Sequence, residues 1–522
     1  MKRSFTKHFY SILKIAVVVL LMYPVTSFSH DLTVRDETIP DSVVSNIVND
    51  FLAASNSGER DAMQEFILLH FDKNALRRIP LFAVVSLNMG FHYETGGLGY
   101  ELIKILPSKP DLITAELYNK LTQTIIKFTI PVSGAPMYKI NRFIKSEPTA
   151  SKSNEKQVIQ LSEEEVVKRI EKCLNKLVED EEFSGAVLIA KNGTILLEKA
   201  IGEASKAYEI PNKTDTKFNM ASVGKMFTGV AVTQLAEKGL LSFDDPISKY
   251  VGAEWLSPEI SEKIQIKHLL THTSGLGDYF RDAYMQCAIP FFRDLEDYKS
   301  LIVDDTLIFE PGTRFSYSNT GMLILGVVIE NVTNDKYFNY LKKNLFEPAG
   351  MVNTDGFDKD SPVKNRATGY TKVYENGSVT WNNHQFTRIM RGSPSGGIYS
   401  TIEDMLKFDI AIRSNILLSP EYSEILLEGR PELNASFHSY GFFNSKGAAG
   451  RELRHKGDGQ GMNCHFKMYL DSGYTYVVLS NYSPPSANIV ANVIDQLLTF
   501  STHILQPTSQ PPTGIDSDEF LL

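Results

Sequence analysis

A serine and a lysine three residues apart, Ser222 and Lys225, form the most informative chemical pair in the chain. Side chains three apart on a helix lie on one face, about one turn from each other. A neutral lysine amine next to a hydroxyl can accept its proton, so the serine becomes a nucleophile without a histidine. The pair therefore predicts nucleophilic catalysis.

The setting of Ser222 separates it from other serines with the same spacing to a lysine. Ser222 opens a run with apolar residues at helical spacing, and Gly239 follows as a stop signal. Serine is also a preferred N-cap residue, so the motif alone leaves cap and nucleophile as equal interpretations. The other serines lie in the basic, apolar N-terminus, in a polar segment or before a proline: Ser4, Ser11, Ser153 and Ser361.

Two further motifs lie downstream of Ser222. Tyr317 and Asn319 follow a Pro-Gly turn and precede a long apolar helical pattern. A phenol can relay a proton, and an amide can hydrogen-bond a polar substrate. His455 and Gly457 lead into a predicted hairpin, where a glycine lets a ligand approach the strand backbone. By itself, this triplet favours a histidine at a strand end over a catalytic group.

The elements that must position these residues follow from the hydrophobic periodicity. Alternating runs joined by turn residues predict two hairpins, at 186–199 and at 462–480. A helical pattern, capped by Ser162 and Glu165, precedes the first hairpin, and another, at 487–500, follows the second. We expect one antiparallel sheet completed by both ends of this domain, with a mostly helical region between them.

A small α+β domain is predicted for residues 30–146, ahead of the sheet-forming domain. Helical patterns at its start are followed by strand-like stretches. Its layout resembles the cone-shaped nuclear-transport-factor-like fold. Residues 147–160 are polar and aperiodic, as expected of a linker. The patterns are helical at 43–54 and 61–70 and strand-like at 112–118, 124–130 and 137–144.

Residues 1–29 have the pattern of an export signal, with basic residues, a short apolar run and small residues at Ser27-Phe28-Ser29. The apolar run is too short to span a bilayer comfortably. We expect a periplasmic or secreted protein with no stable membrane span after cleavage, and an uncleaved anchor is the alternative. Residues 504–522 are Pro-rich and acidic and predict a disordered tail.

The composition limits the partners and cofactors. With 53 basic against 62 acidic residues, the net charge of -9 provides no broad basic surface, so we expect no nucleic-acid partner. The three cysteines, Cys173, Cys287 and Cys464, are far apart and lack metal-ligand spacing. We expect them to be small buried apolar residues.

In their order along the chain, the three motifs resemble those of the penicillin-recognising serine hydrolases, in the class C beta-lactamase branch. That branch also contains D-alanyl-D-alanine carboxypeptidases, D-aminopeptidases and esterases. The segments at 269–276 and 395–401 resemble the family too. The resemblance covers residues 161–503 and implies a beta-lactamase/transpeptidase-like α+β fold, an antiparallel sheet flanked by helices plus a helical region.

The resemblance implies a role for each motif residue. Ser222 attacks a carbonyl and forms an acyl-enzyme, while Lys225 and Tyr317 share the general base and acid work. Asn319 orients the substrate. The oxyanion sits between the backbone N–H groups of Ser222 and Asp458. No metal or cofactor takes part.

The third motif departs from the common lactamase pattern. His455 stands where most beta-lactamases carry lysine, and Lys456 stands where threonine is usual. In the family both positions, with Gly457, belong to the strand that binds a substrate carboxylate. The departure moves the expectation away from antibiotic hydrolysis. The resemblance gives His272 a structural role beside the site.

The sequence therefore predicts an exported serine hydrolase that cleaves an ester or a D-amino-acid-containing peptide. Its partner is a small-molecule ester or peptide substrate. One alternative is a class C-like beta-lactamase. The other is a sensor that penicillin or a cell-wall peptide acylates without turnover.

Overall fold

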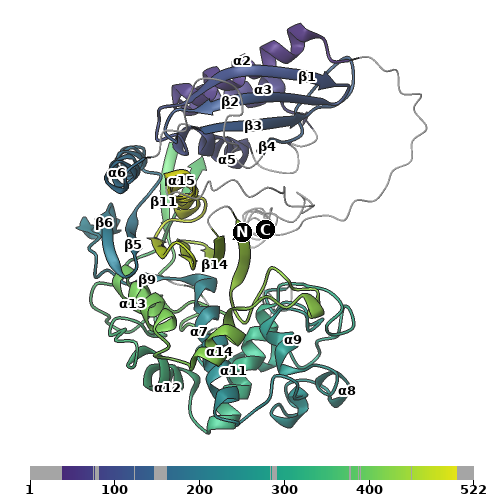
Figure 1. Ribbon diagram of the computed structural model, residues 1–522, viewed down its shortest axis with the longest axis vertical. Helices are drawn as coiled ribbons and strands as arrows, with labels where there is room; N and C mark the ends of the chain where they lie inside the picture. Colours follow the sequence, from purple (N-terminus) through teal and green to yellow (C-terminus); the bar gives the residue numbers. More distant parts are fainter. Residues whose placement is uncertain are drawn as a thin grey trace, which may run out of the picture. The chain divides into compact units, whose positions relative to one another are not determined.

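The computed structural model describes residues 38–73, 76, 81–122, 124–145, 161–281, 284, 291–375, 378–385, 387, 389–447 and 450–501. The described residues form two compact units, divided after Lys176 and again before Gln496 (Figure 1). The predicted signal, linker and tail (1–29, 147–160 and 504–522) lie outside the described residues. Among the described residues, no helix has the length and apolarity needed to cross a membrane.

The first unit packs three helices against a four-stranded antiparallel sheet in the order β1-β2-β3-β4 (Figure 1). Its interior is filled by aromatic rings: Phe51 contacts Phe66, Phe91, Phe128 and Phe143, with ring centroids 4.7–5.8 Å apart. Such rings contribute large apolar areas to a core. The elements are α2 (Asp41–Ser57), α3 (Arg60–His70), α5 (Leu81–Tyr93), β1 (Tyr100–Lys109), β2 (Leu112–Asn119), β3 (Thr124–Pro131) and β4 (Ile144–Lys145).

The α+β class of this unit is confirmed, but one predicted strand is wrong. Residues 137–144 form no continuous strand, and only isolated bridges at Ile140 and the two-residue β4 pair with neighbours. Tyr138 has φ +41°, which a regular strand does not allow. The nuclear-transport-factor-like layout and the domain boundaries stay predictions.

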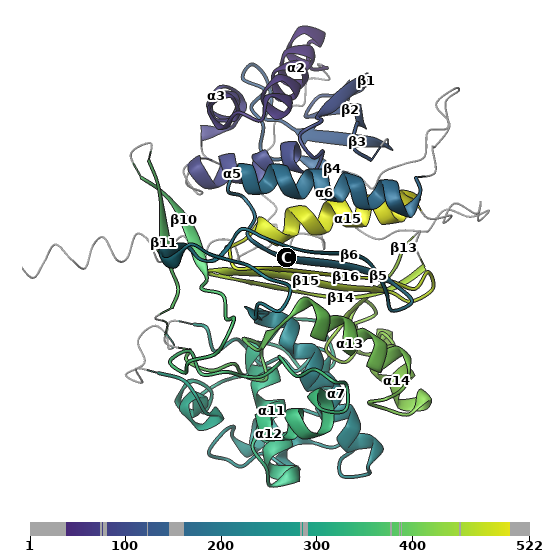
Figure 2. The same ribbon diagram turned by 90° about the vertical axis from the view of Figure 1, so that its left-hand side faces the viewer.

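A six-stranded antiparallel sheet organises the second unit, in the order β13-β14-β15-β16-β5-β6. Both predicted hairpins are confirmed, and β16 pairs with β5, so that segments from opposite ends of the domain lie side by side (Figure 2). This arrangement is the single completed sheet that we expected. The strands are β5 (Gly185–Lys191), β6 (Thr194–Ile201), β13 (Phe443–Gly447), β14 (Gly450–Gly459), β15 (Met462–Tyr469) and β16 (Tyr474–Ser480).

Helices cover both faces of this sheet. All seven residues of β16 are buried, as expected of a strand that is covered on both sides. α13 (Ile402–Arg413) packs on one face, against β16 and β5, and the part of α15 (Ser486–Ser501) up to Asp495 lies on the other (Figure 2). On that face, Tyr469 and Lys467 both donate to the Asp495 carboxylate.

Two predicted helix features are found in the helices α6 and α15. α6 (Glu163–Glu179) begins with the expected cap, in which the Glu165 N–H donates to Ser162 Oγ at 3.2 Å. α15 covers the final helical pattern. Both helices cross the division between the two units, so the predicted limits of the hydrolase domain, 161 and 503, stay predictions.

The helical region is built around α7 (Lys225–Glu237). Every residue of α7 from Lys225 to Ala236 is buried, so the helix is enclosed on all sides. Gly229 allows the close packing, because a Cβ there would lie 2.1 Å from the carbonyl oxygen of Tyr440. The helices around α7 include α9 (Ile266–Leu270), α11 (Asn319–Thr333), α12 (Tyr337–Leu341) and α14 (Pro420–Leu427).

We expect Gly229→Ala to lower the free energy of unfolding by about 1–3 kcal/mol, because the new methyl group overlaps a backbone carbonyl that cannot turn aside. Denaturant titration followed by circular dichroism measures the change. Gly321→Ala in α11 is the matched control, since its Cβ would meet only ordinary contacts at 3.5 Å or more. The control should be neutral or stabilising by up to about 1 kcal/mol. Equal stability of the two variants would contradict the packing argument.

Candidate active site

Ser222 lies in a 3-10 turn, Ala221–Gly224, that continues directly into α7. Gly224 is the N-cap of α7, and no side chain caps the helix. The N-cap interpretation of Ser222 is therefore wrong. Because turn and helix are continuous, the side chains of Ser222 and Lys225 remain neighbours, as their spacing predicts.

The backbone just before Ser222 has an uncommon conformation. Ala221 has φ +46°, in the left-handed region that favours glycine. Hydrogen bonds hold it on both sides: its N–H donates to Asn219 Oδ1, and its carbonyl accepts from the Gly397 N–H, each at 2.9 Å. Such conformations persist only where the surroundings fix them, and they cluster at active sites.

Lys225 is fully buried, and its amine lies among three oxygen atoms. Nζ is 3.0 Å from Ser222 Oγ and 2.7 Å from Asn319 Oδ1, and it also donates to the carbonyl of Ser395. Burial lowers the pKa of Lys225 to about 7, and the Asp278 carboxylate acts in the opposite direction. A large fraction of the amine is therefore neutral at pH 7 and able to accept a proton.

Tyr317 completes the contacts around the serine. Its hydroxyl hydrogen-bonds to the side chain of Ser222, and its ring centroid lies 4.7 Å from Lys225 Nζ. Burial raises the pKa of Tyr317, and the bond to Ser222 opposes this only in part. The phenol is therefore protonated at rest and can donate a proton. The structure thus brings Ser222, Lys225 and Tyr317 together.

Asn319, the first residue of α11, is held between the Lys225 amine and the Asp278 carboxylate. Its Oδ1 accepts from Lys225, while its Nδ2 donates to Asp278 Oδ2 at 2.7 Å. α11 is capped by Ser318, whose Oγ accepts from the Gly321 N–H at 2.9 Å. The sequence analysis did not single out Asp278, and its only signal was its position just after the family-like segment at 269–276.

His455 lies on β14 and is buried. Its Nδ1 donates to the carbonyl of Lys456 at 2.7 Å, and its Nε2 has no hydrogen-bond partner within the described part of the chain. Burial holds the pKa of His455 well below its usual range, and the nearby Lys225 adds to this. His455 is therefore a neutral imidazole rather than a cation.

Gly457 brings β14 directly beside the segment that carries Ser222. A Cβ at Gly457 would lie 2.2 Å from the carbonyl oxygen of Met220, so only glycine fits this approach. Asp458 follows, and its exposed side chain accepts a hydrogen bond from Asn463 Nδ2 at 2.6 Å. Turn and strand therefore meet here, as the resemblance predicted.

Two more buried histidines line this region. The His272 ring packs on the Tyr317 ring, with centroids 4.4 Å apart, and on His438 at 4.9 Å. His272 Nδ1 accepts from the Ser318 N–H at 3.2 Å, which agrees with the structural role expected for it. Burial lowers the pKa of His438 to about 3. His438 belongs to no motif, so only the tertiary contacts reveal it.

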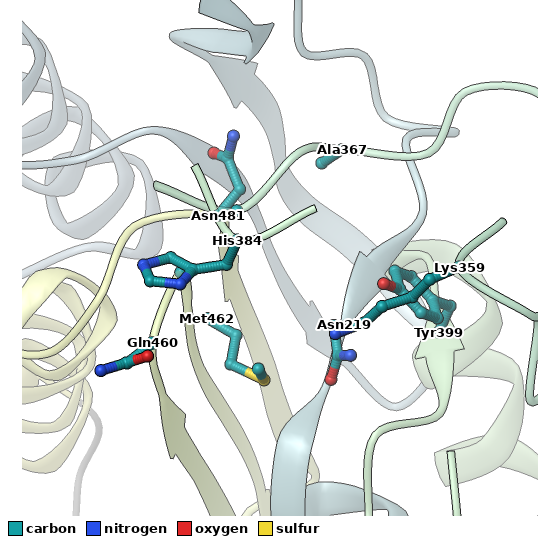
Figure 3. Close-up of a pocket in the computed structure, with 10 residues that line it drawn as sticks. Asn219, Lys359, Ala367, His384, Tyr399, Gln460, Met462 and Asn481 are labelled. Carbon is teal, nitrogen blue, oxygen red and sulfur yellow. The ribbon is translucent and has the colours of Figure 1, made fainter. Parts of the chain in front are cut away.

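A separate polar pocket lies beside Asn219 (Figure 3). Asn219 ends β9 (Phe218–Asn219), which pairs with β12 (Tyr399–Ser400). The proposed nucleophile and its lysine and tyrosine are not among the lining residues, but Asn219 also holds the turn before the serine. The other lining residues are Lys359, Ala367, Gly369, His384, Tyr399, Gln460, Gly461, Met462 and Asn481. No group of three or more His, Cys, Asp or Glu side chains among the described residues is arranged to hold a metal.

Comparisons with known proteins agree with this geometry. Residues 170–499 match the family model described as Beta-lactamase. A penicillin-binding protein of Bacillus subtilis (strain 168) is 29% identical over 327 residues, which are 60% of this chain and 71% of that protein. The crystal structure of a penicillin binding protein from Bacillus halodurans has a TM-score of 0.55 and 32% identity, covering 61% of this chain and 98% of that chain.

A D-amino acid amidase from Ochrobactrum anthropi SV3 shares the fold, with a TM-score of 0.53 at 20% identity, over 65% of this chain and 98% of that chain. At this identity the likeness shows the fold alone. The match to the family model carries more weight. Its residues, 170–499, include the whole of the second unit, with its sheet and its helical region. The chain therefore belongs to the beta-lactamase family and is a serine hydrolase.

Proposed function

We propose that the protein is an exported serine hydrolase that cleaves an ester or a D-amino-acid-containing peptide through an acyl-enzyme on Ser222. The observation that carries this proposal is the Lys225 amine, buried and 3.0 Å from Ser222 Oγ, with its pKa lowered to about 7. A neutral amine at this distance accepts the Oγ proton as the serine attacks. Export rests on the pattern at 1–29 alone.

The remaining residues supply the other parts of an acyl transfer. As Oγ bonds to the substrate carbonyl, the backbone N–H groups of Ser222 and Asp458 stabilise the oxyanion, each donor being worth about 10²–10³ in rate. Tyr317, protonated because it is buried, donates a proton to the leaving group, and the proton that Lys225 took from Ser222 replaces it. Asn319 orients the substrate. Water then cleaves the acyl-enzyme and restores the serine hydroxyl.

The charge on the third motif favours substrates without a carboxylate at this strand, such as simple esters, over beta-lactams. His455 is neutral, and the Lys456 ammonium lies 3.8 Å from the Asp458 carboxylate. This strand therefore offers a substrate carboxylate no strong, fixed cation. The penicillin-binding relatives favour a second candidate, acylation by penicillin, either with turnover as a beta-lactamase or without turnover as a sensor.

We expect Ser222→Ala to lower hydrolysis of p-nitrophenyl acetate by at least about 10³-fold, because the nucleophile is lost. A fluorophosphonate probe followed by mass spectrometry should label Ser222 in the wild type. Ser361→Ala is the matched control, since Ser361 has the same spacing to a lysine but no contact with the site in the described structure. Labelling of any other serine would show that the nucleophile is wrongly assigned.

We expect kcat/KM to rise with pH through an inflection near 7. The pKa of Lys225 is lowered from its ordinary value, so the active neutral amine predominates above this pKa and is lost as the pH falls through it. Lys225→Arg stays charged and should be inactive at every pH. Lys238→Arg, just beyond the other end of α7, should keep the wild-type profile. A profile that is flat between pH 5 and 9 would contradict the role of Lys225 as the base.

We expect the wild type to turn over p-nitrophenyl acetate faster than nitrocefin, because the neutral His455 does not hold the nitrocefin carboxylate. A D-Ala-D-Ala peptide, which also carries a carboxylate, is measured beside them. Initial rates at equal enzyme concentration measure this order. Faster turnover of nitrocefin would favour the beta-lactamase. Stable penicillin labelling of Ser222 without turnover of any of the three would favour the sensor.

A further inference from the structure

Asp278 is a carboxylate beside the proposed catalytic residues, and no ion pair joins it to another described residue. Its Oδ2 accepts from Asn319 Nδ2 at 2.7 Å and from the Asn319 backbone N–H at 3.4 Å, and its Oδ1 accepts from the Phe280 N–H at 2.9 Å. Within the described ranges, no lysine, arginine or histidine nitrogen lies within 4.0 Å of it. Arg281, three residues later, instead pairs with Asp305 at 2.6 Å.

The Asp278 carboxylate can accept one more hydrogen bond. An ionised carboxylate has about four lone-pair sites, and three N–H groups occupy Asp278. The side chain is only half-buried, and the neighbouring Phe280 is 46% exposed, so a substrate group can reach it. The open position therefore suits one strong donor.

The carboxylate is also close to the reacting atoms. A continuous chain of contacts runs from Ser222 Oγ to Lys225 Nζ (3.0 Å), on to Asn319 Oδ1 (2.7 Å), and across that amide to Asp278 Oδ2 (2.7 Å). A group bound at Asp278 thus lies next to the amide that we propose orients the substrate.

The surrounding charges leave Asp278 uncompensated. Buried His272, His438 and His455 are neutral, and the buried amine of Lys225, with its pKa lowered to about 7, is neutral in a large fraction at pH 7. An asparagine at 278 keeps the hydrogen bond from Asn319 through its amide oxygen, although it loses the one from the Phe280 N–H. The carboxylate therefore adds a negative charge. Such a charge attracts a cationic group of the substrate.

We propose that Asp278 is a specificity-determining residue that binds an ammonium group on the acyl part of the substrate. The preferred substrates are then amides, peptides or esters with a free amino group close to the reacting carbonyl. This inference rests on the proposed function, because it names the substrate class of the same site. Substrates that carry a carboxylate at that position are disfavoured by repulsion.

The test compares two matched inhibitors of p-nitrophenyl acetate hydrolysis at pH 7. D-alaninamide carries the ammonium group, and propionamide has the same skeleton without it. We expect the wild type to bind D-alaninamide about tenfold or more tightly than propionamide, as one hydrogen bond between charged groups provides. Equal inhibition constants for the wild type would overturn the inference, whether or not any variant folds.

The variant that tests the residue is Asp278→Asn, which removes the charge and keeps an acceptor for Asn319, but loses the hydrogen bond from the Phe280 N–H. We expect the ratio of the two inhibition constants to fall to about one. This ratio does not depend on how much activity the variant retains. Asp278→Glu, which restores the charge, should recover part of the preference. Asp244→Asn, which removes an exposed carboxylate that pairs with Lys267, should leave the ratio unchanged. A tenfold preference that survives in Asp278→Asn would show that another group binds the ammonium.

The two proposals fail in different ways. If the wild type hydrolyses p-nitrophenyl acetate and a fluorophosphonate labels Ser222, but the two inhibitors bind equally, only the role of Asp278 is wrong. If neither hydrolysis nor labelling occurs, the proposed function is wrong, and the inference about Asp278 fails with it.

Discussion

The burial of one amine is the constraint on which the second unit depends. Water stabilises an ammonium ion strongly, and its removal disfavours the charged form of Lys225. Only a side chain enclosed on every side loses enough water for this effect, and α7 is such a helix. The packing of α7 is therefore a chemical requirement as well as a structural one, because it makes a lysine able to act as a base near neutral pH.

The amine is desolvated by burial, which lowers its pKa to about 7, and yet it stays hydrogen-bonded. Oxygen atoms of Ser222, Asn319 and Ser395 surround Nζ, so the amine is not left without partners in a dry interior. The imidazoles of His272 and His455, also neutral, place no positive charge beside it. A buried ammonium without partners would destabilise the fold. Here the amine has hydrogen-bond partners, and burial lowers its pKa.

The sheet serves this site by bringing distant parts of the chain together. β14 passes beside the turn of Ser222 because Gly457 has no side chain to hold them apart. The same turn is tied to Asn219 and Gly397 by hydrogen bonds. Three segments that are far apart in the sequence therefore meet at one serine. A change at any of these segments therefore alters the surroundings of Ser222.

The sequence by itself determined the fold class, the two hairpins and the identity of the central motif residues. Short-range patterns carry these, because alternation, helical spacing and turn residues act over a few positions. The strand predicted at 137–144 was wrong. Tyr138 has a positive φ, and an alternation of apolar and polar residues does not reveal backbone angles. It also left Ser222 with an N-cap interpretation that the 3-10 turn removes.

Only the tertiary structure decided the environment of each motif. The neutrality of His455, the lowered pKa of Lys225 and the contact of Asp278 with Asn319 all depend on residues that are distant in sequence. His438 carries no motif at all, yet it packs against His272. Desolvation and charge act through space rather than along the chain, so residue types and spacing specify which groups are present, and folding specifies what chemistry they can perform.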